Sequence, residues 1–197
     1  MLYVNYFGTR IDNASKQLLN YFWFKNGFSP EECNKVIEVA KNYPQQNGST
    51  FTDSHNKNQY RKSNVRWIEL EESSLWIYEK LMFMANEANK VFSLDITGFT
   101  EKLQFTEYEG AGSKYGYHMD IGPDNWHRKL SIVVQLSDPN AYTGGELVLN
   151  TGGNEIHCPN EWGSVIVFPS ILQHEVMPIQ SGNRYSLVSW ISGAPWK

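Results

Sequence analysis

Residues 103–136 read LQFTEYEGAGSKYGYHMDIGPDNWHRKLSIVVQL. This stretch holds three short apolar segments, 103–108, 115–120 and 129–136, which are separated by glycine, proline and asparagine. Short segments bounded by turn-forming residues are typical of β-strands. Further segments at similar spacing follow at 146–149, 155–158, 164–168, 174–178 and 184–191. We therefore predict a two-layered, all-β core of the sandwich or barrel type over residues 101–197.

The first half of the chain, residues 1–100, has the pattern of helices instead. The sequence SPEE at 29–32 indicates a helix start, because serine can cap, proline suits the first helical position and Glu32 can close a capping box. Apolar residues repeat at helical spacing from there to about residue 42, and again over about 74–92. The predicted fold class is therefore mainly β with flanking helices, in which N-terminal helices brace the β core.

A polar segment without periodicity, residues 45–64, lies between the two predicted helices. It is longer than the usual connection in a compact domain. It contains basic residues, among them His55, Lys57 and Arg61, with only Asp53 opposing them. Two interpretations follow, a solvated loop or a loop that grips a substrate.

The composition fits one globular domain and narrows the classes of partner. The chain has 197 residues, with 17 Lys+Arg against 21 Asp+Glu and a net charge of −4. This acidic balance argues against binding to a phosphate backbone, so nucleic acid is not an expected partner. Cys33 and Cys158 match no disulfide or metal-binding pattern, which favours two unpaired thiols in a reducing compartment. With neither an export signal nor a membrane span visible, we expect a cytoplasmic protein that does not act on membranes.

Three residues of the second half have the chemistry of a metal site. His118 and Asp120 are two positions apart on a predicted strand, so both side chains project from one face and can reach the same metal. His174, near the start of a later predicted strand, adds a second imidazole. Two imidazoles and one carboxylate leave half of an octahedron open, as in non-haem Fe(II) sites that bind a cosubstrate and oxygen. We therefore predict that His118, Asp120 and His174 are catalytic metal ligands, because a structural zinc site would close all four positions with Cys and His.

A candidate anion-binding residue follows on the last predicted strand. The segment 184–190 reads RYSLVSW, and its alternate positions share one face of a strand. A guanidinium inside a small barrel needs an anion, and the carboxylate of a small dicarboxylic acid fits the fork of Arg184. Ser186 can add a hydroxyl donor on the same face. The alternative is that Arg184 forms a surface ion pair or pairs with an internal glutamate.

In their order along the chain, these residues resemble the Fe(II)/2-oxoglutarate-dependent dioxygenases, and within them the prolyl 4-hydroxylase-like branch. The resemblance covers the whole second half. It is carried by QFTEY at 104–108, Gly110, Gly112, Tyr115, HMD at 118–120, RKLS at 128–131, LSDP at 136–139, YTGGEL at 142–147, Gly163, FP at 168–169, HEVMP at 174–178, GNRYS at 182–186 and Trp190.

This resemblance implies a double-stranded β-helix, or jelly roll, that makes up the catalytic core. Fe(II) would be held by His118, Asp120 and His174, and Arg184 would bind the distal carboxylate of 2-oxoglutarate. Asp120 retains the carboxylate ligand, so a halogenating enzyme, which needs that position free for halide, is not expected.

The resemblance also implies roles for residues around the metal. Tyr108 matches a position beside the cosubstrate, and Gln135 stands where some relatives present Tyr or Thr to 2-oxoglutarate, so an amide contact or none is expected there. Trp190 matches an aromatic residue near the substrate pocket. Tyr115 and Arg66 are assigned to the substrate as well.

The implied activity is hydroxylation of an unactivated C–H bond, with succinate and CO2 as coproducts and ascorbate as a reductant. The preferred substrate is a proline-containing protein or peptide. Residues 45–64 lie, in chain order, where relatives carry a loop that covers the target peptide, which favours the interpretation of this segment as a lid.

Three other functions remain open. One is hydroxylation of a free amino acid or another small molecule by the same chemistry. Repair of alkylated nucleic-acid bases is disfavoured by the acidic balance and by Trp190, where that branch tends to place a second arginine. A non-catalytic jelly-roll metal-binding module is the third, although such a module would not need Arg184 and the three metal ligands together.

Overall fold

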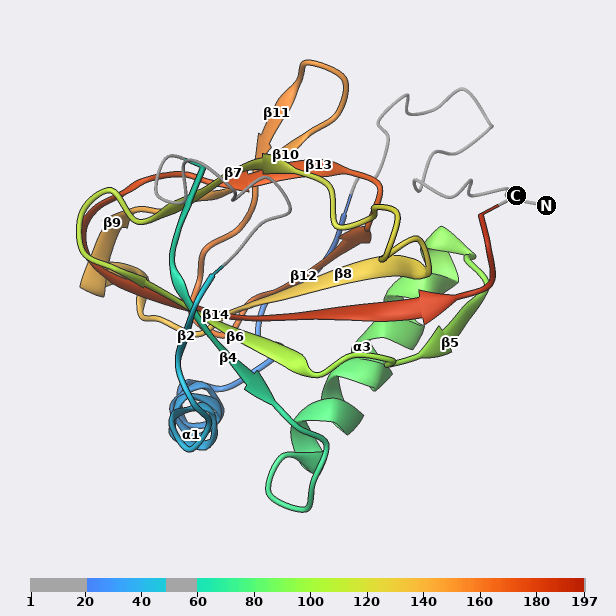
Figure 1. Cartoon of the computed structure of the whole chain (residues 1–197), viewed down its shortest axis with the longest axis horizontal. Helices are drawn as coiled ribbons and strands as arrows, with labels where there is room; N and C mark the ends of the chain where they lie inside the picture. The colour runs from blue at the N-terminus through green and yellow to red at the C-terminus, as the bar shows by residue number, and fades with distance from the viewer. Residues whose placement is uncertain (1–20, 49–59, 197) are drawn as a thin grey trace.

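The computed structural model of the chain describes residues 21–48 and 60–196. Its strands form two antiparallel sheets that face each other (Figure 1). The larger sheet has the strand order β1 (Phe22–Phe24), β12 (Val165–Pro169), β8 (Arg128–Gln135), β14 (Ile179–Gly193), β6 (Leu103–Glu109), β4 (Asn64–Ile68) and β2 (Gln46–Asn47), with β5 (Ile96–Gly98) and β9 (Tyr142–Gly144) paired to β14. The smaller sheet has the order β11 (Glu155–His157), β10 (Leu147–Asn150), β13 (Gln173–Val176), β7 (Lys114–His118) and β3 (Arg61–Lys62). This arrangement is a jelly roll, so the predicted fold class is confirmed.

Helices α1 (Pro30–Lys41) and α3 (Leu75–Phe92) cover the outer face of the larger sheet (Figure 1). The predicted capping box at the start of α1 is present, because the Ser29 hydroxyl accepts from the Glu32 N–H and the Glu32 carboxylate accepts from the Ser29 N–H. Each helix buries one apolar side, in α1 through Cys33, Val36 and Ala40. No helix in the described part of the chain is long and apolar enough to cross a membrane.

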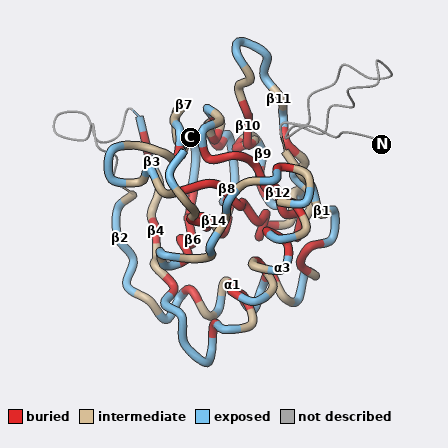
Figure 2. Tube along the Cα trace, turned by 90° about the vertical axis from the view of Figure 1, so that its right-hand side faces the viewer, coloured by how far each residue is buried: buried red, intermediate tan, exposed pale blue. Residues whose placement is uncertain are grey.

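The alternation of side chains along the larger sheet separates two cores. Leu187 of β14 and Phe105 of β6 pack toward the helices, in a cluster that includes their apolar faces. The side chains between them, such as Ser186 and Thr106, face the smaller sheet and line a cavity. Figure 2 shows that buried residues are concentrated in the strands of the two sheets, whereas the turn between β10 and β11 protrudes and is exposed. Between the two sheets lie the polar side chains that line the cavity and a second, smaller apolar cluster.

Two of the differences from the predicted strands bear on the site. The predicted strand 115–120 ends at His118, and Asp120 follows it with its N–H bonded to the Ser170 carbonyl instead of a ladder partner. The first half also contributes strands: β4 lies beside β6 in the larger sheet, and β3 beside β7 in the smaller one. The polar segment 45–64 thus includes β2, β3 and the start of β4, whereas residues 49–59, with His55 and Lys57, lie outside the described residues.

Both cysteines are buried and unpaired, as predicted. Cys33 lies on α1 and Cys158 follows β11. Burial raises the pKa of each thiol to about 12. Neither thiol is therefore in its reactive thiolate form at neutral pH.

Candidate functional site

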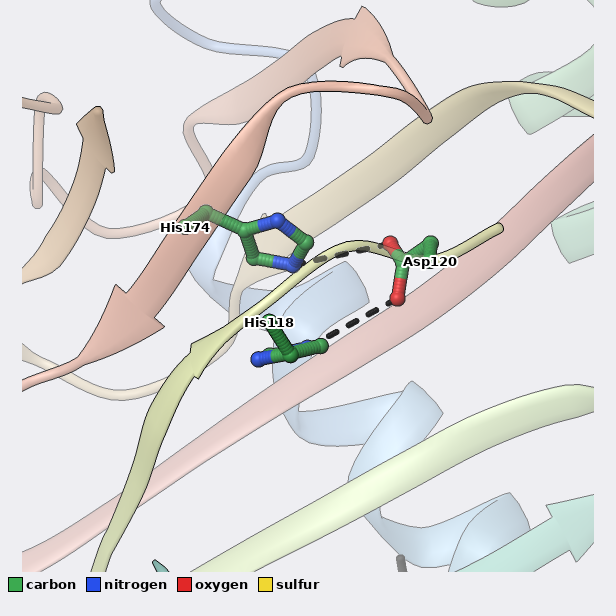
Figure 3. Close-up of side chains that lie close together, drawn as sticks. All are labelled: His118, Asp120 and His174. Atoms are coloured by element: carbon green, nitrogen blue, oxygen red, sulfur yellow. Dashed lines mark ion pairs between the residues drawn. The ribbon is translucent and has the colours of Figure 1, made fainter. Parts of the chain in front are cut away.

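The structure brings His118, Asp120 and His174 together (Figure 3). His118 ends β7 and lies directly opposite His174 on the neighbouring β13. The Asp120 carboxylate lies between the two rings, with Oδ1 3.6 Å from His118 Nε2 and Oδ2 3.5 Å from His174 Nε2. The potential ligand atoms all lie within 4.8 Å of one another. His174 lies 54 residues beyond Asp120 in the sequence. The pairing of β7 with β13 therefore brings it to the other two residues.

Both imidazoles are oriented by backbone carbonyls. His118 Nδ1 lies 2.8 Å from the Gly116 carbonyl oxygen, and His174 Nδ1 lies 3.0 Å from that of Leu172. Because a carbonyl only accepts, each Nδ1 carries the proton, and the lone pair of each Nε2 is left free for a metal. Burial and the neighbouring His174 lower the pKa of His118 to about 3, which keeps its ring neutral at neutral pH. This is the protonation state that a metal ligand requires.

Asp120 is buried and ionised. Burial opposes its charged form, but His174, His118 and a hydrogen bond from Ser131 together hold the pKa of the carboxyl below its usual value. Two neutral imidazoles with one carboxylate fit a divalent cation and leave coordination positions open on the cavity side. The donor set therefore fits Fe(II), the metal of the family that the sequence resembles.

These three residues border a cavity of about 820 Å³ between the two sheets. Its floor is formed by alternate residues of β6 and β14, and its other walls by β7, β13 and the segment after His118. The floor side chains are Gln104, Thr106, Tyr108, Arg184, Ser186, Val188 and Trp190. The predicted shared face of residues 184, 186, 188 and 190 is thus confirmed.

Arg184 lies in this cavity wall with 1% of its surface exposed. Its Nη2 donates to the Gln135 Oε1 atom at 2.8 Å, whereas its Nη1 is buried without a hydrogen-bond partner. None of the carboxylates in residues 21–48 and 60–196 forms an ion pair with it. The surface ion pair and the internal glutamate partner are therefore both wrong. A buried cation with a free donor on a cavity fits an anionic ligand, because an unpaired buried donor is costly.

Two further predicted cosubstrate residues lie beside Arg184. Tyr108 is its cross-strand neighbour on β6, and the guanidinium lies 5.2 Å from the centre of the Tyr108 ring. Burial raises the pKa of Tyr108, so its phenol stays protonated and can donate. Ser186 is the next residue on the same face of β14 and also borders the cavity.

Gln135 does not border the cavity. Its amide oxygen accepts from Arg184, and its amide nitrogen lies 3.4 Å from the Pro159 carbonyl oxygen. An amide contact with the cosubstrate or none is predicted for Gln135, and in this structure its amide oxygen contacts Arg184. Gln135 instead holds one side of the arginine that faces the cavity.

Of the residues predicted to contact substrate, Trp190 and Tyr115 lie in the cavity wall and Arg66 does not. The Tyr115 ring stacks on the His118 ring, with centroids 3.6 Å apart and 15° between the planes. Arg66 lies on the helix-facing side of β4, where it forms an ion pair with Glu107 at 3.2 Å and donates to the Tyr43 carbonyl at 2.7 Å. The assignment of Arg66 to the substrate is therefore wrong, because the alternation along β4 turns its neighbour Trp67 to the cavity instead.

Several residues that border the cavity were not predicted from the sequence. Gln104 and Thr106 precede Tyr108 at intervals of two, so the period of a strand could have identified them. Arg128 stacks over the Trp190 ring at 3.6 Å and is paired with Glu101, at 2.7 and 2.5 Å. No motif signals this arrangement, because Arg128 and Glu101 come from different segments.

Comparisons with known proteins agree with this geometry. Residues 103–192 match the model of the 2OG-Fe(II) oxygenase superfamily. A PKHD-type hydroxylase of Rippkaea orientalis is 30% identical over 171 residues, which cover 81% of this chain and 72% of the relative. A PKHD-type hydroxylase of Crocosphaera subtropica is 28% identical over 171 residues, covering 84% of this chain and 75% of the relative.

Solved structures show the same fold. A Pseudomonas putida prolyl-4-hydroxylase superposes with a TM-score of 0.71 at 18% identity, covering 89% of this chain and 93% of that one. A Trichoplax adhaerens prolyl hydroxylase, in complex with a peptide fragment of the hypoxia inducible factor oxygen degradation domain, superposes with a TM-score of 0.74 at 19% identity, covering 88% and 84%. On the match in sequence to a PKHD-type hydroxylase over most of both chains, this chain belongs to the 2OG-Fe(II) oxygenase superfamily and is a dioxygenase whose family uses Fe(II) and 2-oxoglutarate.

Proposed function

We propose that this chain hydroxylates a prolyl residue of a peptide or protein, with Fe(II) at His118, Asp120 and His174 and 2-oxoglutarate anchored by Arg184. One observation carries the proposal. The buried Arg184 side chain has an unpaired Nη1 donor in the wall of the same cavity that the three metal-binding side chains border. A ligand that bridges this donor and the metal must carry an anionic group at each end, and 2-oxoglutarate does.

The chain's own residues bind and orient the reactants. His118 and His174 would hold the metal through their Nε2 atoms and Asp120 through its carboxylate, so the three side chains would supply one negative charge to a divalent ion. Bound Fe(II) supplies the oxygen chemistry, in which O2 converts 2-oxoglutarate to succinate and CO2 and a substrate C–H to C–OH. Ascorbate then serves as a reductant that keeps the metal in its ferrous form.

Arg184 sets the direction in which the cosubstrate lies. Its guanidinium offers Nη1 to the distal carboxylate while Gln135 holds Nη2. The protonated Tyr108 phenol and the Ser186 hydroxyl lie on the same cavity face and supply further donors. The buried position of these groups excludes water from the carboxylate, which strengthens each hydrogen bond.

The substrate side of the cavity is aromatic. Trp67 and Trp190 form a tilted pair with ring centroids 6.3 Å apart, and Tyr115 lies against His118. Faces of this kind suit the apolar, saturated ring of proline. A peptide substrate is supported by the Trichoplax adhaerens neighbour, which is a prolyl hydroxylase in complex with a peptide.

The first test is an anaerobic titration of the Fe(II)-loaded protein with 2-oxoglutarate, followed through the visible charge-transfer band of a chelated keto acid. We expect a band in the wild type, no band in His174→Ala and a much weaker affinity in Arg184→Ala. Arg66→Ala is the matched control, because it removes an arginine that lies outside the cavity. Absence of a band in iron-loaded wild type would refute the cosubstrate assignment.

The second test identifies the substrate. Proline-containing peptides are incubated with the loaded enzyme, 2-oxoglutarate and air, and fragment mass spectra locate any added oxygen. We expect the oxygen on proline, and loss of product in Trp67→Ala. Turnover of a free amino acid but of no peptide would refute the peptide substrate and show that the enzyme hydroxylates small molecules.

A further inference from the structure

The Asp120 carboxylate is fixed by a serine on the neighbouring sheet. Ser131 Oγ donates to Asp120 Oδ2 at 2.6 Å, within the short range expected for a hydroxyl bound to a carboxylate. Ser131 lies on β8 and has no exposed surface, so this bond is shielded from water. Asp120 itself is 7% exposed. The contact is therefore a buried, charge-assisted hydrogen bond to the only acidic member of the metal site.

A second serine stands behind the first. The Ser131 and Ser170 hydroxyl oxygens lie 3.0 Å apart, and Ser170 is also fully buried. Ser131 Oγ is the donor in both contacts, so its single proton lies between the Asp120 carboxylate and the Ser170 hydroxyl. The carboxylate is the stronger acceptor because it is charged, and it also lies closer to Ser131.

The backbone around Asp120 is held by the same neighbours. The Asp120 N–H donates to the Ser170 carbonyl at 3.2 Å, and the Ser170 N–H donates to the Lys129 carbonyl at 2.9 Å. The Asp120 carbonyl accepts from Arg128 Nη1 at 3.0 Å. Because Asp120 lies beyond the end of β7, these contacts replace the strand ladder that positions His118 and His174.

We propose that Ser131 is a positioning residue that limits Asp120 to one metal-binding oxygen, Oδ1. A carboxylate can bind a metal through one or both oxygens, and a second bound oxygen would occupy a position that the cosubstrate or oxygen needs. Ser131 engages Oδ2 and stops the carboxylate from turning. This inference rests on the proposed metal site.

The test measures Co(II) binding to the metal-free protein under anaerobic conditions, by the visible absorption of the bound ion. We expect Ser131→Ala to weaken Co(II) binding by about 10- to 100-fold, the usual effect of losing a hydrogen bond to a metal ligand. The Co(II) bands should also change in shape and intensity, because the coordination of Asp120 changes. Ser131→Thr keeps the hydroxyl on a strand that accepts β-branched residues, so it should restore both affinity and bands.

Ser189→Ala is the matched control. Ser189 is also a buried serine of the larger sheet, and its Oγ has no hydrogen-bond partner. Its removal should leave Co(II) affinity and bands as in the wild type. Thermal unfolding in EDTA checks that each variant folds. If Ser131→Ala does not fold, Ser131→Cys, whose thiol is a weaker donor than the hydroxyl, should show a smaller loss in the same direction.

The outcomes separate this inference from the proposed function. If wild-type protein binds Co(II) and Ser131→Ala, or Ser131→Cys in its place, gives the same affinity and bands, the positioning role is refuted while the metal site stands. If Ser189→Ala loses as much affinity as Ser131→Ala, the effect is general packing and the positioning role is again refuted. If the wild type binds no Co(II), the proposed metal site falls and the inference with it.

Discussion

Replacing Arg184 by methionine should change the stability of the metal-free protein little and should weaken the binding of 2-oxoglutarate strongly. The guanidinium is buried, and of its donors Nη2 meets Gln135 while Nη1 meets no partner. Without a ligand the protein therefore contains a buried cation that is only partly satisfied. Methionine has a similar length, fills the space and brings no charge.

The magnitudes follow from these contacts. An unsatisfied buried donor destabilises the folded protein by about 1–3 kcal/mol. Removing Arg184 Nη1 should therefore offset most of the stability that is lost with the Nη2 hydrogen bond to Gln135. The double variant Arg184→Met/Gln135→Leu also removes the Gln135 amide, which the single variant leaves without its Arg184 partner. It should unfold at a temperature equal to the wild type or higher, by about 2–4 °C for each kcal/mol gained.

The affinity should change in the opposite direction. Removing one partner of a buried ion pair costs about 3–5 kcal/mol. At about 1.4 kcal/mol for each factor of ten, 2-oxoglutarate should bind at least about 100-fold more weakly to Arg184→Met.

The assay is thermal unfolding of the metal-free and the Co(II)-loaded protein, with and without 2-oxoglutarate. Ligand binding raises the unfolding temperature of the wild type, because only the folded state binds. In Arg184→Met this increase should vanish at ligand concentrations that saturate the wild type. A variant that keeps the full increase, or a metal-free double variant that is several kcal/mol less stable, would refute the role of Arg184 as an anion site.

Three other predictions concern different parts of the molecule. Gln135→Glu should place a carboxylate against Arg184 and compete with the cosubstrate, so the KM for 2-oxoglutarate should rise at least about tenfold, and an unchanged KM in steady-state assays would contradict this. The metal-free protein should lose stability as the pH falls from about 6.5 toward 3, because the pKa of His118 is lowered to about 3 in the folded state and the unfolded chain binds its proton first. The unfolding temperature should therefore depend less on pH in His118→Gln. An equally steep dependence in that variant would count against a buried neutral imidazole. Ser29→Ala should lower the free energy of unfolding by about 1 kcal/mol through loss of the α1 cap, measured by urea titration, and should leave 2-oxoglutarate affinity unchanged.

The sequence predicted those parts of the site that depend on the period of a strand. Arg184, Ser186 and Trp190 alternate along β14, and their shared face is the one that borders the cavity. His118 and His174 were placed on two strands by pattern, and the pairing of β7 with β13 brings them together. In these cases local periodicity determines the direction of a side chain, and the fold class determines which face is inside.

Contacts between distant segments decide the parts of the site that the sequence does not predict. Arg66 and Trp67 are adjacent, and which of them faces the cavity depends on the register of β4 against β6, which no local pattern shows. Gln135 is on the cavity side of β8, but Arg184 lies between it and the open space and takes its amide oxygen. Asp120 lies beyond its strand and is held by Ser131 and a backbone bond to Ser170, so its position also depends on packing.

The most direct test of the central claim is a crystal structure of the protein prepared without oxygen, with Fe(II) and 2-oxoglutarate bound. We predict one metal ion bonded to His118 Nε2, His174 Nε2 and a single Asp120 oxygen, with the keto-acid end of the ligand on the metal and its distal carboxylate on Arg184 Nη1. A metal bound elsewhere, or a cosubstrate whose distal carboxylate does not contact Arg184, would contradict the account.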